Sequence, residues 1–453
     1  MPASFNLIEA PFIPCRTAAG TALLGLRDAL GRAHEIVEVA DPSPLTTFAL
    51  YRFLLVVVHR ALGPGDWGGD RLPMDRIDKY LGGVRDRFDL FDARRPFLQE
   101  VVGDEAKLLS VSELIAELPT ATNINHARHA LDATVALCPV CCAHGLLRLA
   151  PFCGQGGQGK APSINAPPPA YFLPLGPTLF DTLRRNAAAL PRVPGDAPAW
   201  EVGVPKTKEI GPLEAFTWQP RTVHLREPAP AGTPCTLCGR GDVPAVHRIV
   251  FQKGRDRSDP RVRAWRDPHA AYATETRGRV EVVRTLVPPE VIQRTDAAAG
   301  FWRQTAAVVL RGEPFRCAAV DSPGCADGCV RVVALHTRQA KVLHDHAEDW
   351  ILPPLTDADR AELLEHLDWL RDGLAGVGDA LRARDEFERR AEGLFRRRLA
   401  GGSADDFRRD VLHLVTGLTR PGADPHRPLT VHAARRKAET AARDAFPIPE
   451  VTP

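Results

Sequence analysis

The chain has no surplus of charge of either sign and lacks the residue pattern expected of an export signal. Its 58 basic and 56 acidic residues leave a formal charge of +2, so the protein as a whole attracts neither nucleic acid nor anionic lipid strongly. Glu9 stands where a signal peptide carries basic residues, and no small-residue cleavage site follows an apolar stretch. We therefore expect a cytoplasmic protein in which any nucleic-acid contact is local.

Long hydrophobic runs are also absent. The longest strongly apolar run, near Phe53 to Val58, is flanked by Arg52, His59 and Arg60. It falls far short of the roughly 20 residues that cross a bilayer, so we expect no membrane-spanning segment and no membrane partner. The 453 residues are nevertheless 44% hydrophobic, which is enough for a large core and suggests two or three globular domains.

The placement of cysteine is the most informative feature that is present. Ten cysteines without an export signal favour reduced thiols or metal ligands over disulfides. Two pairs, Cys138-Pro-Val-Cys141 and Cys235-Thr-Leu-Cys238, have the two-residue spacer that lets a turn direct both sulfurs at one ion. Without a thioredoxin-like βαβ setting, two such pairs favour metal over redox chemistry. We predict a closed, structural Zn²⁺ site formed by these four thiolates.

The remaining cysteines leave two questions open. Cys142 and Cys153 lie close enough in sequence to replace one of the four ligands. Cys317, Cys325 and Cys329 form a third group whose irregular spacing matches no zinc motif, and they stay unassigned.

The pattern of apolar residues predicts a mixed α/β fold. Ser43 and Pro44 are typical of a helix start, and the apolar stretch to Leu62 carries this helix into the core. Alternation across residues 272–287 predicts a β-hairpin. Beyond Pro354, apolar residues recur at helical spacing, as in Leu363, Leu367, Leu370, Leu374, Phe387, Ala391, Leu394 and Phe395. We expect a large irregular N-terminal domain with the zinc site, residues 1–354, and a C-terminal antiparallel helical bundle, residues 355–453.

Two function classes are compatible with a zinc site in a globular chain of this size. A zinc-dependent phosphohydrolase or nuclease needs an open coordination site and a general base, but no His-Glu-x-x-His occurs. His344-Asp345-His346 resembles part of a hydrolase site, yet further ligands are not recognisably placed. The other alternative is a zinc-stabilised interaction scaffold without DNA contact.

Several short segments occur in a specific order around the paired cysteines. They are Phe5-Asn-Leu-Ile8, Pro11-Phe-Ile-Pro14, Arg87-Phe-Asp-Leu-Phe91, Ala121-Thr-Asn123, Phe216-Thr-Trp-Gln-Pro220 and Trp265-Arg-Asp-Pro-His269. In these segments the chain resembles the CasA family, the large subunit of the type I-E CRISPR surveillance complex Cascade. The resemblance covers most of the chain, although the C-terminal bundle looks shorter than the family usually carries.

The resemblance implies a non-catalytic subunit. Members of the family read the protospacer-adjacent motif in double-stranded DNA, help to open the duplex into an R-loop, and recruit the helicase-nuclease. Reading beyond the motif belongs to base pairing with the guide RNA, a division of labour also known from another effector class. The implied partners are the guide-RNA complex backbone and small subunits, the target duplex and the helicase-nuclease. The preferred motif is not implied.

Two loops near the cysteine pairs match positions at which the family contacts the motif. Small residues let backbone groups approach a DNA groove closely. The glycine loop of the family corresponds here to Gly157, Gln158, Gly159 and Lys160. The loop that the family inserts near the motif and the complex backbone offers Asn125, His126 and Arg128. The alternatives are an ordinary flexible loop for the first segment and a polar surface loop for the second.

Two further segments complete the site that the resemblance implies. Gln339, with Arg338 beside it, matches the glutamine wedge that stands in the stack as base pairs part. Arg255, with Lys253 and Arg257 as alternatives in register, falls where the family places a lysine that contacts the motif. The predicted zinc would tie the bases of these loops together, so its removal should loosen motif reading.

Overall fold

A computed structural model describes most of the chain in two compact units. The described residues are 4–63, 67–118, 135–153, 162–226, 228–230, 232–277, 280–289, 300–322, 325, 327–338, 341–370, 384–418 and 436. By contacts, the first unit comprises residues 1–270 and 331–348, and the second comprises residues 271–330 and 349–453. These units differ from the two domains expected from the sequence, and the domain boundary after Pro354 stays a prediction.

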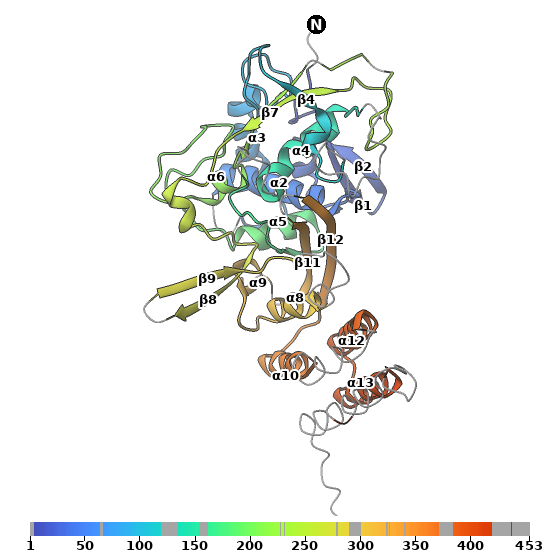
Figure 1. Ribbon diagram of the computed structural model, residues 1–453. Helices are drawn as coiled ribbons and strands as arrows, with labels where there is room; N and C mark the ends of the chain where they lie inside the picture. The colour runs from blue at the N-terminus through green and yellow to red at the C-terminus, as the bar shows by residue number, and fades with distance from the viewer. Residues whose placement is uncertain are drawn as a thin grey trace, which may run out of the picture. The chain divides into compact units, whose positions relative to one another are not determined.

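The first unit is built around helix α2, Pro44–Leu62. The Ser43 side chain accepts a hydrogen bond from the Thr46 backbone N–H at 3.4 Å, and Pro44 occupies the first turn, as the sequence predicts. By length and composition α2 could cross a membrane, but 89% of its most apolar window is buried inside the protein. It is packed as a core helix, and Figure 1 shows it among the other elements of its unit.

The first unit also contains strands of three small three-stranded sheets, and β3 contacts α2. Their strand orders are β2-β1-β3, β4-β7-β6 and β12-β11-β5. The first two are antiparallel throughout. The strands are β1 Ile13–Thr17, β2 Gly20–Leu24, β3 Ile36–Val39, β4 Leu108–Ser110, β5 Tyr171–Leu175, β6 Arg221–Leu225, β7 Arg248–Lys253, β11 Gly328–Arg338 and β12 Lys341–Leu352.

Short helices cover the rest of the core of the first unit. Helix α2 packs against α4, and it also contacts α3, α5 and α6. Their bounds are α1 Leu26–Gly31, α3 Met74–Val84, η1 Arg85–Arg87, η2 Val111–Leu114, α4 Pro139–Phe152, α5 Leu179–Ala187, α6 Pro212–Phe216 and η4 Pro260–Arg263.

The second unit begins with the predicted β-hairpin. Strands β8, Ala271–Arg277, and β9, Val280–Thr285, pair antiparallel with Tyr272 opposite Thr285. The short strand β10, Arg316–Cys317, extends the sheet on the β8 side. Helices α8, Phe301–Val309, and α9, Ala318–Asp321, complete this part of the unit. The prediction of a hairpin across residues 272–287 is confirmed.

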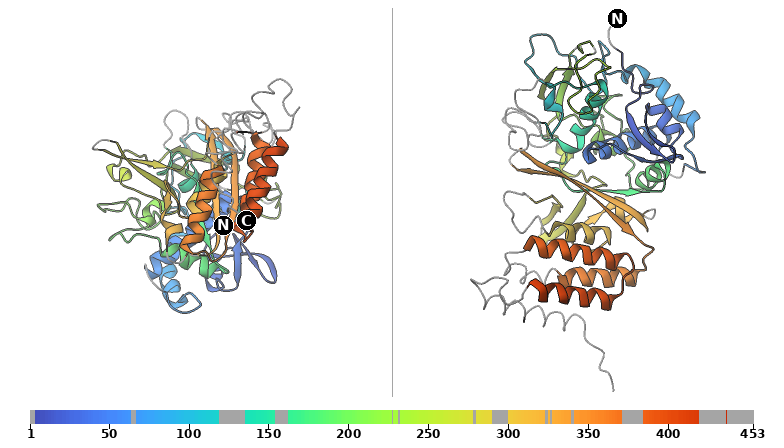
Figure 2. Two further views of the ribbon diagram at one scale, coloured as in Figure 1. Left: turned by 90° about the horizontal axis from the view of Figure 1, so that it is seen from below. Right: turned by 90° about the vertical axis from the view of Figure 1, so that its right-hand side faces the viewer.

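The predicted C-terminal helices are α10, Asp357–Asp368, α12, Arg384–Leu399, and α13, Ala404–Leu418. Figures 1 and 2 show them close together, and α12 packs directly on α13. Most of the apolar residues predicted at helical spacing are buried; these are Leu363, Leu367, Leu370, Phe387, Ala391, Leu394 and Phe395. Leu374 lies outside the described residues. The mixed α/β class is therefore confirmed.

Candidate metal centre and the segments around it

The four predicted cysteines come together. One sulfur from each of Cys138, Cys141, Cys235 and Cys238 lies within 4.8 Å of all the others, and Cys138 Sγ is 3.6 Å from Cys238 Sγ. A tetrahedron of sulfurs around zinc, each bonded at about 2.3 Å, has edges of about 3.8 Å. The donor set and its spacing therefore fit Zn²⁺, whose identity here stays a prediction.

The first pair is positioned by the start of α4. Cys138 lies immediately before the helix in extended conformation, Pro139 is its first residue, and the Cys142 N–H donates to the Cys138 carbonyl oxygen at 3.0 Å. This turn places Cys141 beside Cys138, at a helix N-terminus whose partial positive charge favours thiolates. The two-residue spacer thus has a specific local cause.

The second pair lies in a tight turn. The Gly239 N–H donates to the Cys235 carbonyl oxygen at 2.9 Å, and the Cys235 N–H donates to the Arg240 carbonyl oxygen at 2.8 Å. Gly239 has φ +74°, a conformation that other residues rarely adopt. The glycine that follows the second pair is therefore required by the turn itself.

Backbone hydrogen bonds join the two arms of the cluster. Leu137 and Val246 form an antiparallel bridge, and the Thr236 N–H donates to the Ala136 carbonyl oxygen at 2.8 Å. The Thr236 hydroxyl in turn accepts from the Ala136 N–H at 3.0 Å. These hydrogen bonds align the two arms, and a bound ion would link their four sulfurs directly.

The cluster also favours a thiolate. Hydrogen bonds from Cys138 and Cys141 lower the pKa of the Cys235 thiol, whereas hydrogen bonds with Cys138 and Cys235 raise the pKa of Cys141. Cys235 is therefore the sulfur that the cluster favours as a thiolate, the form that binds metal. Burial raises the pKa of Cys142, whose sulfur points to the Leu137 carbonyl oxygen at 3.7 Å. Neither Cys142 nor Cys153 belongs to the group of four, which answers the question that the sequence left open.

Helix α4 connects this cluster with the glycine loop. Cys138 precedes the helix and Cys153 follows it, at the opposite end of 14 residues that rise about 21 Å. The Ser163 N–H donates to the Cys153 carbonyl oxygen at 2.9 Å, which closes the loop between them at its base. The predicted loop residues Gly157, Gln158, Gly159 and Lys160 themselves lie outside the described residues.

The segment with Asn125, His126 and Arg128 also lies outside the described residues. It is followed directly in sequence by the arm that carries Cys138, which the structure describes from Val135 onward. The cluster therefore lies at the end of one predicted DNA-facing loop and, through α4, is connected to the base of another.

The basic segment that begins at the end of β7 contains a buried and an exposed cation. Arg255 is 16% exposed and pairs with Glu214 at 2.5 Å and Asp259 at 3.0 Å. Its guanidinium carbon lies 3.7 Å from the centre of the Trp218 ring. Lys253 is 51% exposed and pairs with Asp256 at 2.8 Å. The arginine is thus held by internal partners, whereas the lysine ammonium faces solvent.

Two further arginines belong to the same segment. Arg261 also pairs with Glu214, at 2.9 Å, so this buried carboxylate serves two guanidinium groups. A hydrogen bond from Arg261 lowers the pKa of Asp259 to about 2, which keeps that carboxylate charged. Arg257 donates to the Ala166 carbonyl oxygen at 2.5 Å.

The predicted wedge falls between two long neighbouring strands. Strand β11 ends at Arg338 and β12 begins at Lys341, and the two are adjacent in their sheet. Gln339 lies outside the described residues, and of Arg338 only the backbone is described. The predicted turn around position 339 is therefore the connection between β11 and β12.

The zinc-dependent hydrolase remains the alternative that would need a second group of metal ligands with an open coordination position. Among the residues that the structure describes, the cysteine quartet is the one group of three or more potential ligands that come together. His346 on β12 lies in edge contact with the His336 ring, at 6.2 Å between ring centres.

A buried polar network at the base of the glycine loop was missed by the sequence reasoning. Arg52, in the middle of α2, pairs with Asp267 and stacks on the Phe216 ring at 3.7 Å. Asn165 donates to the same carboxylate at 2.6 Å and accepts from Trp265 Nε1 at 2.9 Å. An arginine in the middle of an apolar helix, away from its ends, was the signal that could have indicated such a network.

Comparisons with known proteins agree with this architecture. A sequence profile of the family described as CRISPR-associated protein Cse1 (CRISPR_cse1) matches residues 6–420. A relative from Thermus thermophilus, CRISPR-associated protein CasA/Cse1, is 30% identical over 385 residues, which are 77% of this chain and 71% of the relative.

Solved structures show the same fold. The structure of Thermus thermophilus CasA (Cse1) superposes with a TM-score of 0.72 and 26% identity, over 97% of this chain and 100% of that one. A chain of a structure described as a CRISPR RNA-guided surveillance complex has a TM-score of 0.70 and 20% identity, over 97% of this chain and 100% of that one.

Proposed function

The chain belongs to the family of CRISPR-associated protein Cse1, or CasA, and from that premise we propose that it is the large subunit of a type I-E RNA-guided surveillance complex. In this role it reads the protospacer-adjacent motif in double-stranded DNA, promotes duplex opening and R-loop formation, and recruits the helicase-nuclease. It carries out no reaction itself. Its partners are the backbone subunits and the small subunits of the guide-RNA complex, in the cytoplasm.

The observation that carries this proposal is the position of α4. This helix begins at the cysteine quartet and ends at the base of the glycine loop. The arm before it leads from the segment that contains Asn125, His126 and Arg128. A Zn²⁺ ion bound by the quartet would fix the directions in which both loops leave the core, which is the role of a structural rather than a catalytic zinc.

The basic segment that begins at the end of β7 supplies the third contact. Helix α4 packs against α6, Pro212–Phe216, which carries Glu214, the partner of Arg255. We propose that Arg255 positions the segment and that the exposed Lys253 contacts DNA, because a motif contact needs an accessible cation. Lys253 also has the same side chain as the lysine that the family places here, whereas Arg255 does not.

Gln339 supplies the wedge in this proposal. The bounds of β11 and β12 support it, because two adjacent long strands hold both ends of the segment that contains Gln339. Parting a base step costs a few kcal/mol, so the wedge needs anchored ends and compensating contacts.

The test is a library of duplexes that differ only in the flanking motif, bound by the assembled complex. We expect enrichment of a few motifs and R-loop formation on those. With Gln339→Ala, binding of the motif should persist while duplex opening slows. Equal binding of all motifs would contradict the proposed reading function, and unchanged opening would contradict the wedge. Nuclease or phosphatase activity of the isolated chain would favour a hydrolase instead.

A further inference from the structure

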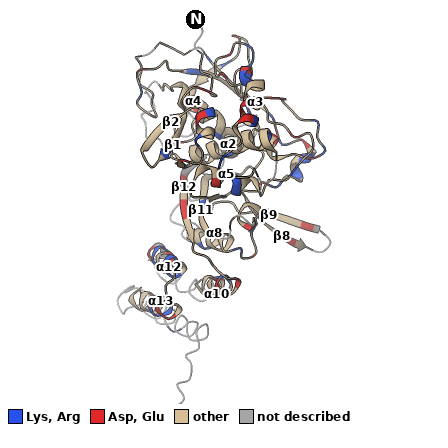
Figure 3. Ribbon diagram, turned by 180° about the vertical axis from the view of Figure 1, so that it is seen from behind, with Lys and Arg blue, Asp and Glu red and all other residues tan. Residues whose placement is uncertain are grey.

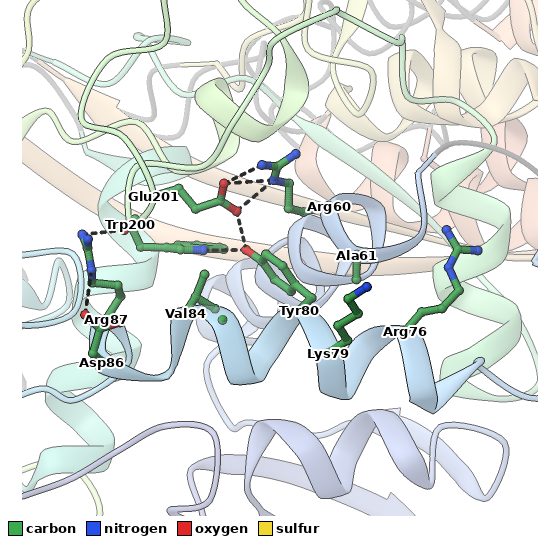
Figure 4. A pocket seen from close by; sticks show the side chains of 11 residues that line it. Arg60, Ala61, Arg76, Lys79, Tyr80, Val84, Asp86, Arg87, Trp200 and Glu201 are labelled. Carbon is green, nitrogen blue, oxygen red and sulfur yellow. Dashed lines mark hydrogen bonds and ion pairs between the residues drawn. The ribbon is translucent and has the colours of Figure 1, made fainter.

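A pocket of about 740 Å³ lies apart from the cysteine quartet, on the first unit (Figure 4). It is bounded by the C-terminal end of α2, by α3 with η1, and by residues 200–201. Its charged lining residues are Arg60, Arg76, Lys79, Arg87, Asp86 and Glu201. Four cations and two carboxylates thus face one cavity. The pocket carries a local excess of positive charge as large as the net charge of the whole chain.

Glu201 and its partners form a hydrogen-bonded group in the wall of the pocket. Glu201 accepts hydrogen bonds from Arg60 Nε at 2.8 Å and from its terminal nitrogen at 2.6 Å. The Tyr80 hydroxyl donates to the same carboxylate at 2.8 Å and accepts from Trp200 Nε1 at 2.8 Å. The Arg60 charge is therefore neutralised, and this wall is held rigidly.

The cations on α3 have no such acidic partner. Arg76 donates to the Leu62 carbonyl oxygen at 2.9 Å, which is a neutral group at the end of α2. Within the described residues, no carboxylate lies within ion-pair distance of Arg76 or Lys79. Arg76 and Lys79 are three residues apart in α3, so they lie on one face of the helix, separated by about one turn. Figure 4 shows both side chains rising from α3 on the side of the pocket.

Arg87 supplies a third, partly engaged cation at the other end. Its Nε is 3.2 Å from Asp86, and its terminal nitrogen donates to the Trp200 carbonyl oxygen at 3.4 Å. Figure 3 shows basic and acidic positions interspersed along the described chain rather than separated into halves. The positive charge of the pocket therefore comes from the particular side chains that line it, and not from a generally basic region of the chain.

We propose that this pocket binds the phosphate groups of a nucleic-acid backbone, with Lys79 and Arg76 as the contacting cations. Such contacts fix register and orientation without reading sequence. A protein partner would need a buried apolar anchor. Here the Trp200 indole is 5% exposed and packs against Phe97 and Phe88, so it offers no such anchor.

The inference rests on the proposed function, to which it adds a sequence-independent grip on the same DNA. Lys79 is the better test residue, because Arg76 also satisfies a carbonyl at the end of α2. We would compare the native full chain with Lys79→Gln in the assembled complex, using duplexes with the preferred motif and with a scrambled one. Lys107→Gln, another exposed lysine of the first unit, is the matched control, and Lys79→Arg should retain the native affinity.

Loss of one phosphate contact should weaken binding about fivefold at 0.15 M salt and reduce the slope of log affinity against log salt by about 0.9. The factor should be the same for both duplexes. Affinity and slope equal to those of the native protein would overturn the proposal. A loss confined to the preferred motif would also overturn it, as would a loss confined to binding of an acidic protein. If the proposed motif reading itself is wrong, the native protein will bind both duplexes equally, which is a different result from any effect of Lys79→Gln.

Discussion

Substitution of Arg255 and of Lys253 separates a structural cation from a DNA-facing one. Arg255 pairs with Glu214, whose side chain is 1% exposed, and with Asp259. Removing one partner of a buried ion pair costs about 3–5 kcal/mol. We expect about 3 kcal/mol for Arg255→Gln, the lower end, because Arg261 continues to pair with Glu214. Lys253→Gln removes an exposed pair and should cost about 0–1 kcal/mol.

Thermal unfolding and DNA binding together measure the difference. At about 2–4 °C per kcal/mol for a domain of 150–250 residues, Arg255→Gln should lower the melting temperature of the first unit by about 6–12 °C. Lys253→Gln should lower it by less than about 4 °C and weaken duplex binding by the assembled complex about fivefold at 0.15 M salt. If Arg255→Gln melts like the native protein and loses motif binding, Arg255 is the reader and our reasoning is wrong.

Further predictions concern stability and metal content. Gly254→Ala should cost about 1–3 kcal/mol in urea unfolding, because the added Cβ would lie 2.6 Å from two backbone atoms. Gly82→Ala, in α3 with nothing within 4 Å, should instead stabilise by about 0.5–1 kcal/mol. Burial lowers the pKa of His269 from 6.5 to about 3, so the unfolded chain protonates first and stability falls as pH drops below 6.5. His269→Phe should remove a slope of up to about 1.4 kcal/mol per pH unit from a pH series of unfolding curves. Elemental analysis should find one zinc per chain in Cys142→Ala and a loss of zinc in Cys141→Ser.

Features set by short-range chemistry could be predicted from the sequence. The start of α2 follows from the Ser43 cap and the proline after it, and the hairpin of β8 and β9 follows from alternation about a glycine turn. The cysteine quartet was predictable because each pair needs only its own turn, at Pro139 and at Gly239. The long separation between the pairs did not matter, since the donor chemistry itself identified them as partners.

Features that depend on distant partners could not be predicted. Arg52 finds Asp267 at a separation of 215 residues, and nothing local indicates that partner. Arg255 looked like a surface cation because its buried partner Glu214 lies 41 residues earlier, on a helix of only five residues. The grouping of residues 271–330 with the C-terminal helices likewise depends on tertiary contacts that no periodicity reports.

The central claim is that the metal-bound quartet holds the motif-reading loops in place and performs no chemistry. Its most direct test is the ratio of affinities for motif-bearing and scrambled duplexes, measured with the assembled complex containing the native chain or Cys235→Ser. We predict that loss of zinc lowers this ratio toward one while sequence-independent binding persists. An unchanged ratio in a complex shown to be free of zinc would contradict the account.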